Sequence, residues 1–279
     1  MKDIECVQFL QWALPQMRMR WPGFRKVRRQ ACKRVGRRIR ELQLPTESAY
    51  RSYLEAHPDE WQILDRMCQI TISRFYRDRN VFTELEKSIL PLLAESALAA
   101  GHTTLDCWCV GGASGEEPYT LALIWEHTLQ QRFPGLTIRI LATDANPQIL
   151  ERAKRAVYPV SALKDLPPAW QKHYFVEQNE GKTYRLRSDY KEGVEYRCHD
   201  IRDGPVKGKY WLVFCRNLTF TYFAEDLQKE ILQYLWDAME STAVLVVGVH
   251  ETLPTEATGF STLPQGTVFY QKEIDVSPP

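Results

Sequence analysis

The sequence predicts an α/β protein in which a mainly parallel sheet follows an all-helical N-terminal domain. Three observations predict this class. The first ninety residues carry only helical periodicity. Short apolar runs alternate with amphipathic segments from residue 104 onward, and a glycine-rich turn at 111–115 separates the first apolar run from a helix. The same alternation predicts helices on both faces of the sheet.

Helical segments are expected throughout the first ninety residues. Proline-containing turns separate several of them, Thr46 begins one helix and Asp59 begins the next. We therefore predict a helical N-terminal domain at 1–90 and a second domain at 91–279. The expected helices cover residues 4–19, 24–42, 46–57, 59–70 and 79–98.

The second domain alternates strands, turns and helices. Residues 175–198 interrupt this order, because TYRLR and VEYRC alternate polar and apolar residues with turn residues between them. We therefore predict a small antiparallel β subdomain inserted at 175–198, and a terminal hairpin in the segment FSTLPQGTVFYQKEI. The expected strands cover 104–110, 137–144, 210–217 and 243–251, and the expected helices cover 117–131, 147–158 and 224–239.

The composition is that of a soluble globular protein, with 44% hydrophobic and 25% charged residues among 279. No apolar run approaches a membrane span, and the N-terminus lacks a signal-peptide pattern, so we expect a cytoplasmic protein without membrane insertion. The seven cysteines have irregular spacings, which favour neither a zinc site nor a disulfide framework. We expect no metal.

Positive charge is concentrated at the N-terminus. Residues 1–41 carry twelve Lys/Arg and three Asp/Glu, and 25–40 carry nine Lys/Arg without an acid. The apolar positions within 24–42 predict a helix with one buried face. Three interpretations compete: a solvated face, a nucleic-acid surface and a surface for an acidic protein. The charge excess argues against the first, and the absence of base-stacking or groove-reading elements argues against the second.

The turn at 111–115 is followed by two acids, Glu116 and Glu117. The turn lacks both the spacing of a dinucleotide fingerprint and the lysine of a phosphate loop, and the two carboxylates would repel phosphate. Asp144 ends the second expected strand, where an acid can bind ribose hydroxyls. A ligand with ribose, positive charge and no phosphate fits, and S-adenosylmethionine has these properties; Gly111 would let the backbone approach it closely.

Simpler roles remain open for these acids. Glu116 and Glu117 could be ordinary first-turn acids that oppose a helix dipole, and Asp144 could cap the following helix. The combination of the three favours the ligand.

Five segments, in order, resemble the CheR family of S-adenosylmethionine-dependent methyltransferases, which methylate glutamates on chemotaxis receptors. The resemblance spans nearly the whole chain. The segments are ISRFYRD (72–78), GGASGEEPYTLAL (111–123), LATDANPQILERAKRAVYPV (141–160), FCRNLTFTYF (214–223) and GVHETL (248–253).

The resemblance implies a Rossmann-like methyltransferase domain, an inserted β subdomain and a glutamate carboxylate as methyl acceptor. It also implies that the basic helix meets an acidic receptor helix, through Arg34, Arg37 and Arg38. Tyr222 and Arg216 would lie at the transfer centre, although a core aromatic and a structural ion pair are their respective alternatives. The implied cofactor contacts, with Gly111 from the turn, are Thr71, Ser73, Arg77, Glu116, Asp144, Asp200, Ile201, Asn217 and Leu218.

This sequence departs from the family pattern at two places that concern the acceptor. One extra residue lies between Asn217 and Tyr222, and the turn at 177–183 lacks the Gly-x-Gly of members that dock on a receptor tail. We therefore expect an enzyme that is not tail-tethered. Two alternatives stay open: a different protein or small-molecule acceptor, and a non-catalytic cofactor-binding regulator with a basic partner-binding helix.

Overall fold

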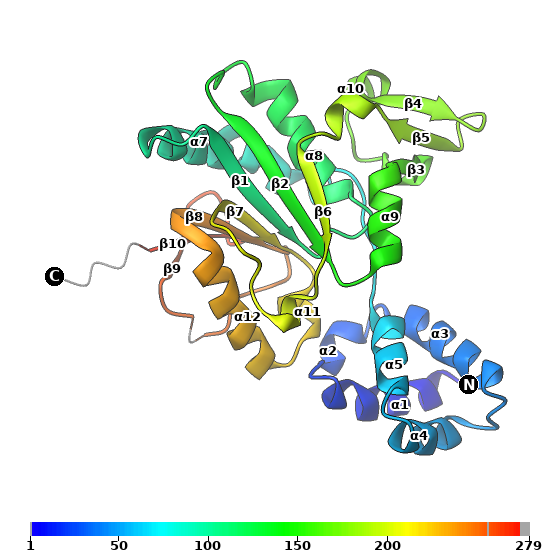
Figure 1. Ribbon diagram of the computed structural model, residues 1–279. Coiled ribbons are helices and arrows are strands. Elements are labelled where there is room, and N and C mark those ends of the chain that lie inside the picture. Colours follow the sequence, from blue (N-terminus) through cyan, green and yellow to red (C-terminus); the bar gives the residue numbers. More distant parts are fainter. Residues whose placement is uncertain (1, 256, 274–279) are drawn as a thin grey trace. The chain divides into compact units, whose positions relative to one another are not determined.

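The structure is a computed structural model that describes residues 2–255 and 257–273 (Figure 1). The chain forms two compact units. The N-terminal unit comprises residues 1–72 and Leu218–Gln228, and the sheet unit comprises the remainder. The unit boundary at Ile72 differs from the expected boundary at 90, because the π-helical turn Leu85–Ile89 packs against α7 (Leu90–Ala99) and the turn Trp125–Leu129 of the sheet unit. None of the helices in the described part of the chain is long and apolar enough to span a membrane.

The N-terminal unit is helical, as expected. The predicted helix 24–42 starts later than expected, at Arg28, because residues 25–27 form a turn after a short helix that ends at Phe24. Thr46 caps α4 by accepting a hydrogen bond from the Ala49 amide at 3.1 Å, as its sequence position predicts. The helices are α1 (Asp3–Gln16), α2 (Trp21–Phe24), α3 (Arg28–Glu41), α4 (Glu47–Ala56), α5 (Glu60–Cys68) and the short α11 (Thr219–Tyr222).

A disulfide joins Cys6 in α1 to Cys32 in α3, with their Cα atoms 5.8 Å apart. This pairing corrects the expectation drawn from irregular cysteine spacing. Spacing along the chain carries no information about two helices that pack side by side, and the packing brings the two thiols together. The bond fixes the buried side of the basic helix α3 to its neighbour.

The segment 218–228 packs within the N-terminal unit although it is far away in sequence. Met19 and Phe223 form an isolated antiparallel bridge. Arg20 donates hydrogen bonds to the carbonyls of Phe220 and Thr221 at the end of α11. Gly23 is required here, because a Cβ at this position would lie 2.2 Å from the Thr221 oxygen.

The sheet unit has the expected α/β fold, with seven strands in the order β6-β2-β1-β7-β8-β10-β9 (Figure 1). The five strands from β6 to β8 pair in parallel, and β10 joins β8 and β9 antiparallel, which confirms the terminal hairpin. The strands are β1 (Thr104–Val110), β2 (Thr137–Asp144), β6 (Val194–Cys198), β7 (Tyr210–Cys215), β8 (Met239–Val247), β9 (Phe260–Thr262) and β10 (Phe269–Lys272).

Helices flank this sheet. α7 packs on β1 and β7, whereas α8 and α9 pack on β2 and β6. Every residue of β7 is buried, so the centre of the sheet is the core of the unit. The helices of this unit are α6 (Arg79–Glu84), α7 (Leu90–Ala99), α8 (Glu116–Ile124), α9 (Pro147–Arg155), α10 (Pro168–Tyr174) and, from Lys229 onward, α12 (Glu225–Ala238), with π-helical turns at Leu85–Ile89 and Trp125–Leu129.

A second, three-stranded antiparallel sheet contains β3 (Val157–Pro159), β5 (Thr183–Leu186) and β4 (Phe175–Gln178). It confirms a small β subdomain, but the predicted span of 175–198 was wrong. The VEYRC segment is β6, which pairs in parallel with β2 at the edge of the large sheet. Its alternating pattern reflects an edge strand with one exposed face, which sequence periodicity cannot distinguish from a hairpin strand.

Candidate cofactor site

The glycine turn joins the carboxyl ends of β1 and β2. The amides of Gly111 and Gly112 both donate to the Thr143 carbonyl, at 2.8 and 2.9 Å. Gly111 has a φ of 72°, and a Cβ on Gly112 would lie 3.1 Å from that of Ala142. These glycines therefore let the turn lie flat on the neighbouring strand, at the edge where open α/β sheets bind ligands.

Gly115 lies among three tyrosines. A Cβ on it would be 2.5 Å from the Tyr196 hydroxyl oxygen and 3.0 Å from both the Tyr158 hydroxyl and the Tyr119 ring, and its φ is 93°. The Tyr158 hydroxyl donates to the Ser114 carbonyl at 2.9 Å. The tyrosines thus fix the backbone that precedes α8. The sequence showed Tyr158 as conspicuous but did not indicate this role.

Glu116 begins α8 and is only 4% exposed. Burial raises the pKa of its carboxyl, while hydrogen bonds from its own amide, Ser114 and Ser73 oppose that shift. The Ser114 hydroxyl lies 2.9 Å from both carboxylate oxygens. Among the ion pairs of the described residues, none includes Glu116, so this buried carboxylate is suited to accept hydrogen bonds from a cationic ligand group.

Asp144 ends β2, and its carboxylate accepts backbone hydrogen bonds from Ala113 at 3.1 Å and Asn146 at 2.9 Å. Burial raises its pKa, against those two hydrogen bonds, and the nearby charge of Asp200 adds to the rise. The side chain that caps α9 is Asn146, which removes the capping alternative for Asp144. Asp144 instead ties the glycine turn to the end of β2.

Asp200 and Ile201 follow β6. Asp200 forms a two-pronged ion pair with Arg202, with one N–O distance of 2.6 Å. Burial alone would raise the pKa of Asp200, but the hydrogen bond and charge of Arg202 outweigh it, and the pKa lies below its usual value. Ile201 is buried. Both residues lie next to β2, because Cys198 pairs with Asp144.

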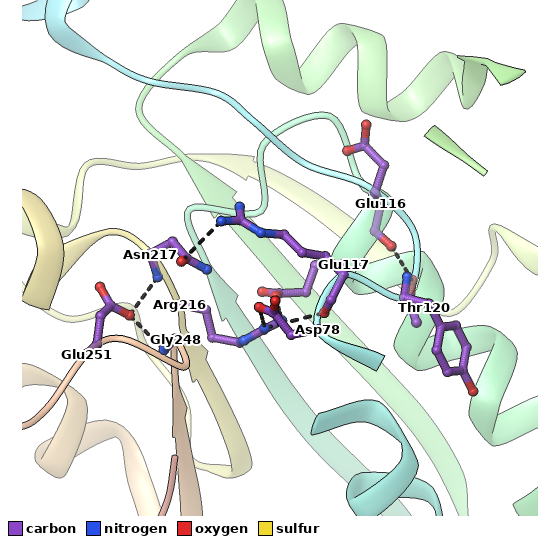
Figure 2. Close-up of polar contacts among 10 residues, drawn as sticks. Asp78, Glu116, Glu117, Thr120, Arg216, Asn217, Gly248 and Glu251 are labelled. Carbon is purple, nitrogen blue, oxygen red and sulfur yellow. Dashed lines mark hydrogen bonds and ion pairs between the residues drawn. The ribbon is translucent and has the colours of Figure 1, made fainter. Parts of the chain in front are cut away.

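Arg77 and Asn217 contact each other at the ends of different elements. Arg77 Nη2 donates to Asn217 Oδ1 at 3.2 Å. The backbone amide of Asn217 donates to the buried carboxylate of Glu251 at 2.6 Å (Figure 2). The same Glu251 oxygen accepts the Gly248 amide at 2.7 Å. Glu251 was missed, and the only signal was the acid within the GVHETL segment.

Arg216, which was predicted to lie at the transfer centre, takes part in a buried ion-pair network. Its side chain is 1% exposed and pairs with Asp78 and Glu117, each at 2.7 Å (Figure 2). A guanidinium buried between two carboxylates favours the structural alternative, and the catalytic role of Arg216 stays a prediction. Nη2 also reaches the Arg77 carbonyl at 3.4 Å. Glu117 is therefore an ion-pair partner, in addition to being a first-turn acid.

The basic helix α3 divides its charges between two faces. Arg38 forms a two-pronged pair with the buried Glu60, at 2.9 and 2.8 Å, and Arg34 donates to two carbonyls at the end of α5. These contacts favour structural roles for Arg34 and Arg38, and their predicted substrate contacts stay predictions. Arg37 is exposed and belongs to a row of cations spaced by four, four and three residues. We call this row the basic stripe; it comprises Arg29, Lys33, Arg37 and Arg40.

Three other predicted site residues, Thr71, Leu218 and Tyr222, belong to the N-terminal unit. The Tyr222 ring packs edge-on against Phe24, with ring centroids 5.0 Å apart. The extra residue before Tyr222 falls in the single turn of α11. The cofactor and catalytic roles of these three residues stay predictions.

Similarity to known proteins identifies the family of this chain. Residues 71–269 match the family model described as CheR methyltransferase, SAM binding domain. The chain belongs to the CheR methyltransferase family. It is 32% identical over 204 residues to the chemotaxis protein methyltransferase of Listeria monocytogenes, which covers 73% of each chain. It is 28% identical over 225 residues to chemotaxis protein methyltransferase 2 of Pseudomonas aeruginosa, covering 78% of this chain and 76% of that one.

A third relative is an uncharacterized 104.1 kDa protein of Rhodobacter capsulatus, 31% identical over 232 residues. The match covers 83% of this CheR-family chain and 24% of that protein, so the chain spans about a quarter of that relative.

Family membership makes this chain an S-adenosylmethionine-dependent methyltransferase, and the described residues fit that cofactor. The buried carboxylate of Glu116 and the partly buried carboxylate of Asp144 lie beside the glycine turn, and the Arg77 guanidinium lies at the same edge of the sheet. An ammonium, two ribose hydroxyls and a carboxylate complement these groups. Within residues 2–255 and 257–273, no cluster of three or more potential metal ligands was found.

Proposed function

We propose that this CheR-family enzyme methylates glutamate side chains on an acidic helix of a chemoreceptor-like cytoplasmic domain. The observation that carries the proposal is the basic stripe on α3. Its four cations are exposed, lie on one helix face and have no ion-pair partner among the described residues. Such a row complements a helix that presents acids at the same spacing. A cytoplasmic location follows from this substrate.

The methyl transfer requires no general base from the protein. A glutamate side chain has a pKa of about 4.3, so at neutral pH it is already an ionised nucleophile and needs no general base. S-adenosylmethionine supplies an electrophilic methyl group. The chain's own residues must therefore hold the two reactants in line and exclude water. This agrees with a site whose described groups bind and orient, and in which Arg216 is occupied by internal pairs.

The cofactor-holding residues have distinct proposed roles. Glu116 would accept hydrogen bonds from the ammonium, Asp144 from the ribose hydroxyls, and Arg77 would pair with the carboxylate end. Tyr222 would contact the methyl group or the substrate. The remaining proposed contacts are Thr71, Ser73, Gly111, Asp200, Ile201, Asn217 and Leu218.

The test uses methyl-labelled S-adenosylmethionine and a purified chemoreceptor cytoplasmic domain. We expect label on glutamate that is released by mild alkali, because carboxyl methyl esters hydrolyse readily. The matched substrate control carries glutamine in place of the acceptor glutamates and should stay unlabelled. Alkali-stable label would contradict the glutamate acceptor, and binding of the receptor domain without turnover would favour a regulator.

A charge-reversed enzyme tests the role of the basic stripe. Lys33→Glu combined with Arg37→Glu should raise the KM for the receptor domain by at least about tenfold, because attraction becomes repulsion. Affinity for S-adenosylhomocysteine should not change. An unchanged receptor KM would show that the basic stripe does not contact the substrate.

We also propose that the enzyme does not dock on a receptor's C-terminal tail. It should therefore be equally active on receptor domains with and without their C-terminal tails.

A further inference from the structure

One buried carboxylate connects the loops that follow two neighbouring strands. β7 and β8 run in parallel and end together, because Cys215 pairs with Val247. Glu251 is 5% exposed. One oxygen of its carboxylate accepts hydrogen bonds from the backbone amides of Asn217, at 2.6 Å, and Gly248, at 2.7 Å. The Glu251 amide in turn donates to the Gly248 carbonyl at 2.9 Å. The carboxylate therefore closes its own turn and reaches across to the β7 loop.

Asn217 needs this support because of its backbone conformation. Its φ is 55°, in the left-handed region that non-glycine residues adopt at a cost. A charge-assisted hydrogen bond to its amide stabilises this conformation. Gly248 makes room for the contact, since a Cβ there would lie 2.7 Å from Glu251 Oε2 and 3.0 Å from Asn217 Oδ1.

The Asn217 side chain contacts the guanidinium of Arg77 and so limits its orientation. Its Oδ1 accepts a hydrogen bond from Arg77 Nη2 at 3.2 Å. The backbone of Arg77 is held separately, through the Arg216 contact to its carbonyl and the ion pair of Arg216 with Asp78. Arg216 thus fixes where the Arg77 side chain starts, and Asn217 fixes where its guanidinium ends.

We propose that Glu251 is a positioning residue that sets the Arg77 guanidinium through Asn217. The inference rests on the proposed cofactor role of Arg77 and Asn217. Glu251 need not touch the cofactor. By keeping Asn217 in its left-handed conformation, it places the asparagine oxygen where the guanidinium is bound in one orientation, ready for the carboxylate end of the cofactor.

The first experiment compares two substitutions at Glu251 by calorimetry with S-adenosylhomocysteine. Glu251→Ala removes the acceptor for two buried amides and should weaken binding by about 10- to 100-fold. Glu251→Gln keeps one acceptor oxygen without the charge, so it should restore part of the affinity. The KM for S-adenosylmethionine should rise in the same order, whereas the KM for the methyl acceptor should stay unchanged.

A matched control separates positioning from general destabilisation. Asp106→Asn also exchanges a carboxylate for an amide in the sheet unit, where Asp106 pairs with Arg139 near the start of β1. It should leave S-adenosylhomocysteine affinity unchanged. If Glu251→Gln, folded as judged by its thermal unfolding midpoint, binds as tightly as the unsubstituted enzyme, the positioning role is wrong.

A double-mutant cycle tests the route through Asn217. Asn217→Gly tolerates a positive φ but lacks the oxygen that contacts Arg77. In that background, Glu251→Gln should weaken binding by less than about threefold, because the path to Arg77 is already broken. Fully additive losses would contradict the route.

The outcome also distinguishes this inference from the proposed function. Failure of the unsubstituted enzyme to bind S-adenosylhomocysteine would contradict the proposed cofactor contacts themselves. Normal binding without receptor methylation would contradict only the proposed acceptor.

Discussion

Arginines serve opposite purposes in the basic helix α3 and at the carboxyl edge of the sheet. On α3, four cations form an exposed stripe without ion-pair partners in the described part of the chain. At the sheet edge, Arg216 is buried and paired with Asp78 and Glu117. The exposed charges are available to a partner, whereas the buried charge organises the backbone around Arg77. Arginine content alone therefore does not indicate which residue meets a substrate.

The same division occurs within α3 itself. Arg38 pairs with Glu60, whose other partner is the Tyr50 hydroxyl at 2.8 Å. This pair lowers the pKa of Glu60, because the Arg38 hydrogen bonds outweigh the effect of burial. Arg37, one residue earlier, is exposed. A shift of one position around the helix thus separates a structural arginine from one that can contact a partner.

The largest effect is expected from breaking the buried network. Arg216→Met leaves Asp78 and Glu117 without their cation, and should lower the free energy of unfolding by about 3–5 kcal/mol, measured by urea denaturation. Arg139→Met is the control: it breaks a pair whose arginine side chain is 64% exposed, and should cost less than about 1 kcal/mol. Equal losses in the two variants would show that burial does not distinguish these pairs.

The sequence predicted the parts of this site that depend on local patterns. The strand–turn–helix order placed Glu116 and Asp144 at one sheet edge, because parallel strands end on the same side. The charge of 25–40 predicted the basic helix. Both follow from residues that are near each other in the chain.

The sequence did not predict the contacts that join distant segments. Arg216 pairs with residues 138 and 99 positions away, and Glu251 reaches an amide 34 positions away. The faces of α3 were assigned without knowing that Glu60 lies opposite Arg38. The disulfide between Cys6 and Cys32 was not predicted for the same reason. Such partners depend on packing between elements, which periodicity within one element cannot specify.

The disulfide gives the second largest expected effect and tests the inner face of α3. Replacing Cys32 by serine opens a link between residues 26 positions apart, and should destabilise the N-terminal unit by about 2–4 kcal/mol. Chemical reduction of the full chain should have the same effect. Cys198→Ser, at an exposed free cysteine, is the control and should change unfolding by less than about 0.5 kcal/mol. Matching stabilities would show that helix packing alone holds α3.

The third prediction concerns pH at the sheet edge. Burial raises the pKa of Glu116 and Asp144, so each loses its charge at a higher pH than an exposed acid. A carboxyl whose pKa is raised by folding favours the folded state when protonated, but it must be ionised to bind the ligand's ammonium group or to accept hydrogen bonds from its hydroxyls with full strength. Affinity for S-adenosylhomocysteine should therefore fall as the pH is lowered below neutral, by about tenfold per pH unit at most for each of the two carboxyls.

Titration of a single acid makes this pH test specific. Glu116→Gln should bind more weakly at pH 7 and lose less affinity on acidification than the unsubstituted enzyme. Proton release on binding, measured in buffers of different ionisation enthalpy, should also be smaller in this variant. A pH profile identical to that of the unsubstituted enzyme would assign the titration to another group.

The smallest effect on stability is expected at the exposed side of α3. Arg37→Ala should change the free energy of unfolding by less than about 0.5 kcal/mol, because this exposed side chain has no ion pair with any described residue. It should raise the KM for an acidic receptor helix by about two- to fivefold, and weaken the dependence of that KM on salt. Lys154→Ala removes an exposed cation from the sheet unit and should leave the receptor KM unchanged.

Arg38→Ala should show the reverse pattern: stability falls because Glu60 loses its cation, and the receptor KM changes little. If Arg37→Ala and Arg38→Ala gave the same loss of stability and the same KM, the two faces of α3 would not have separate roles.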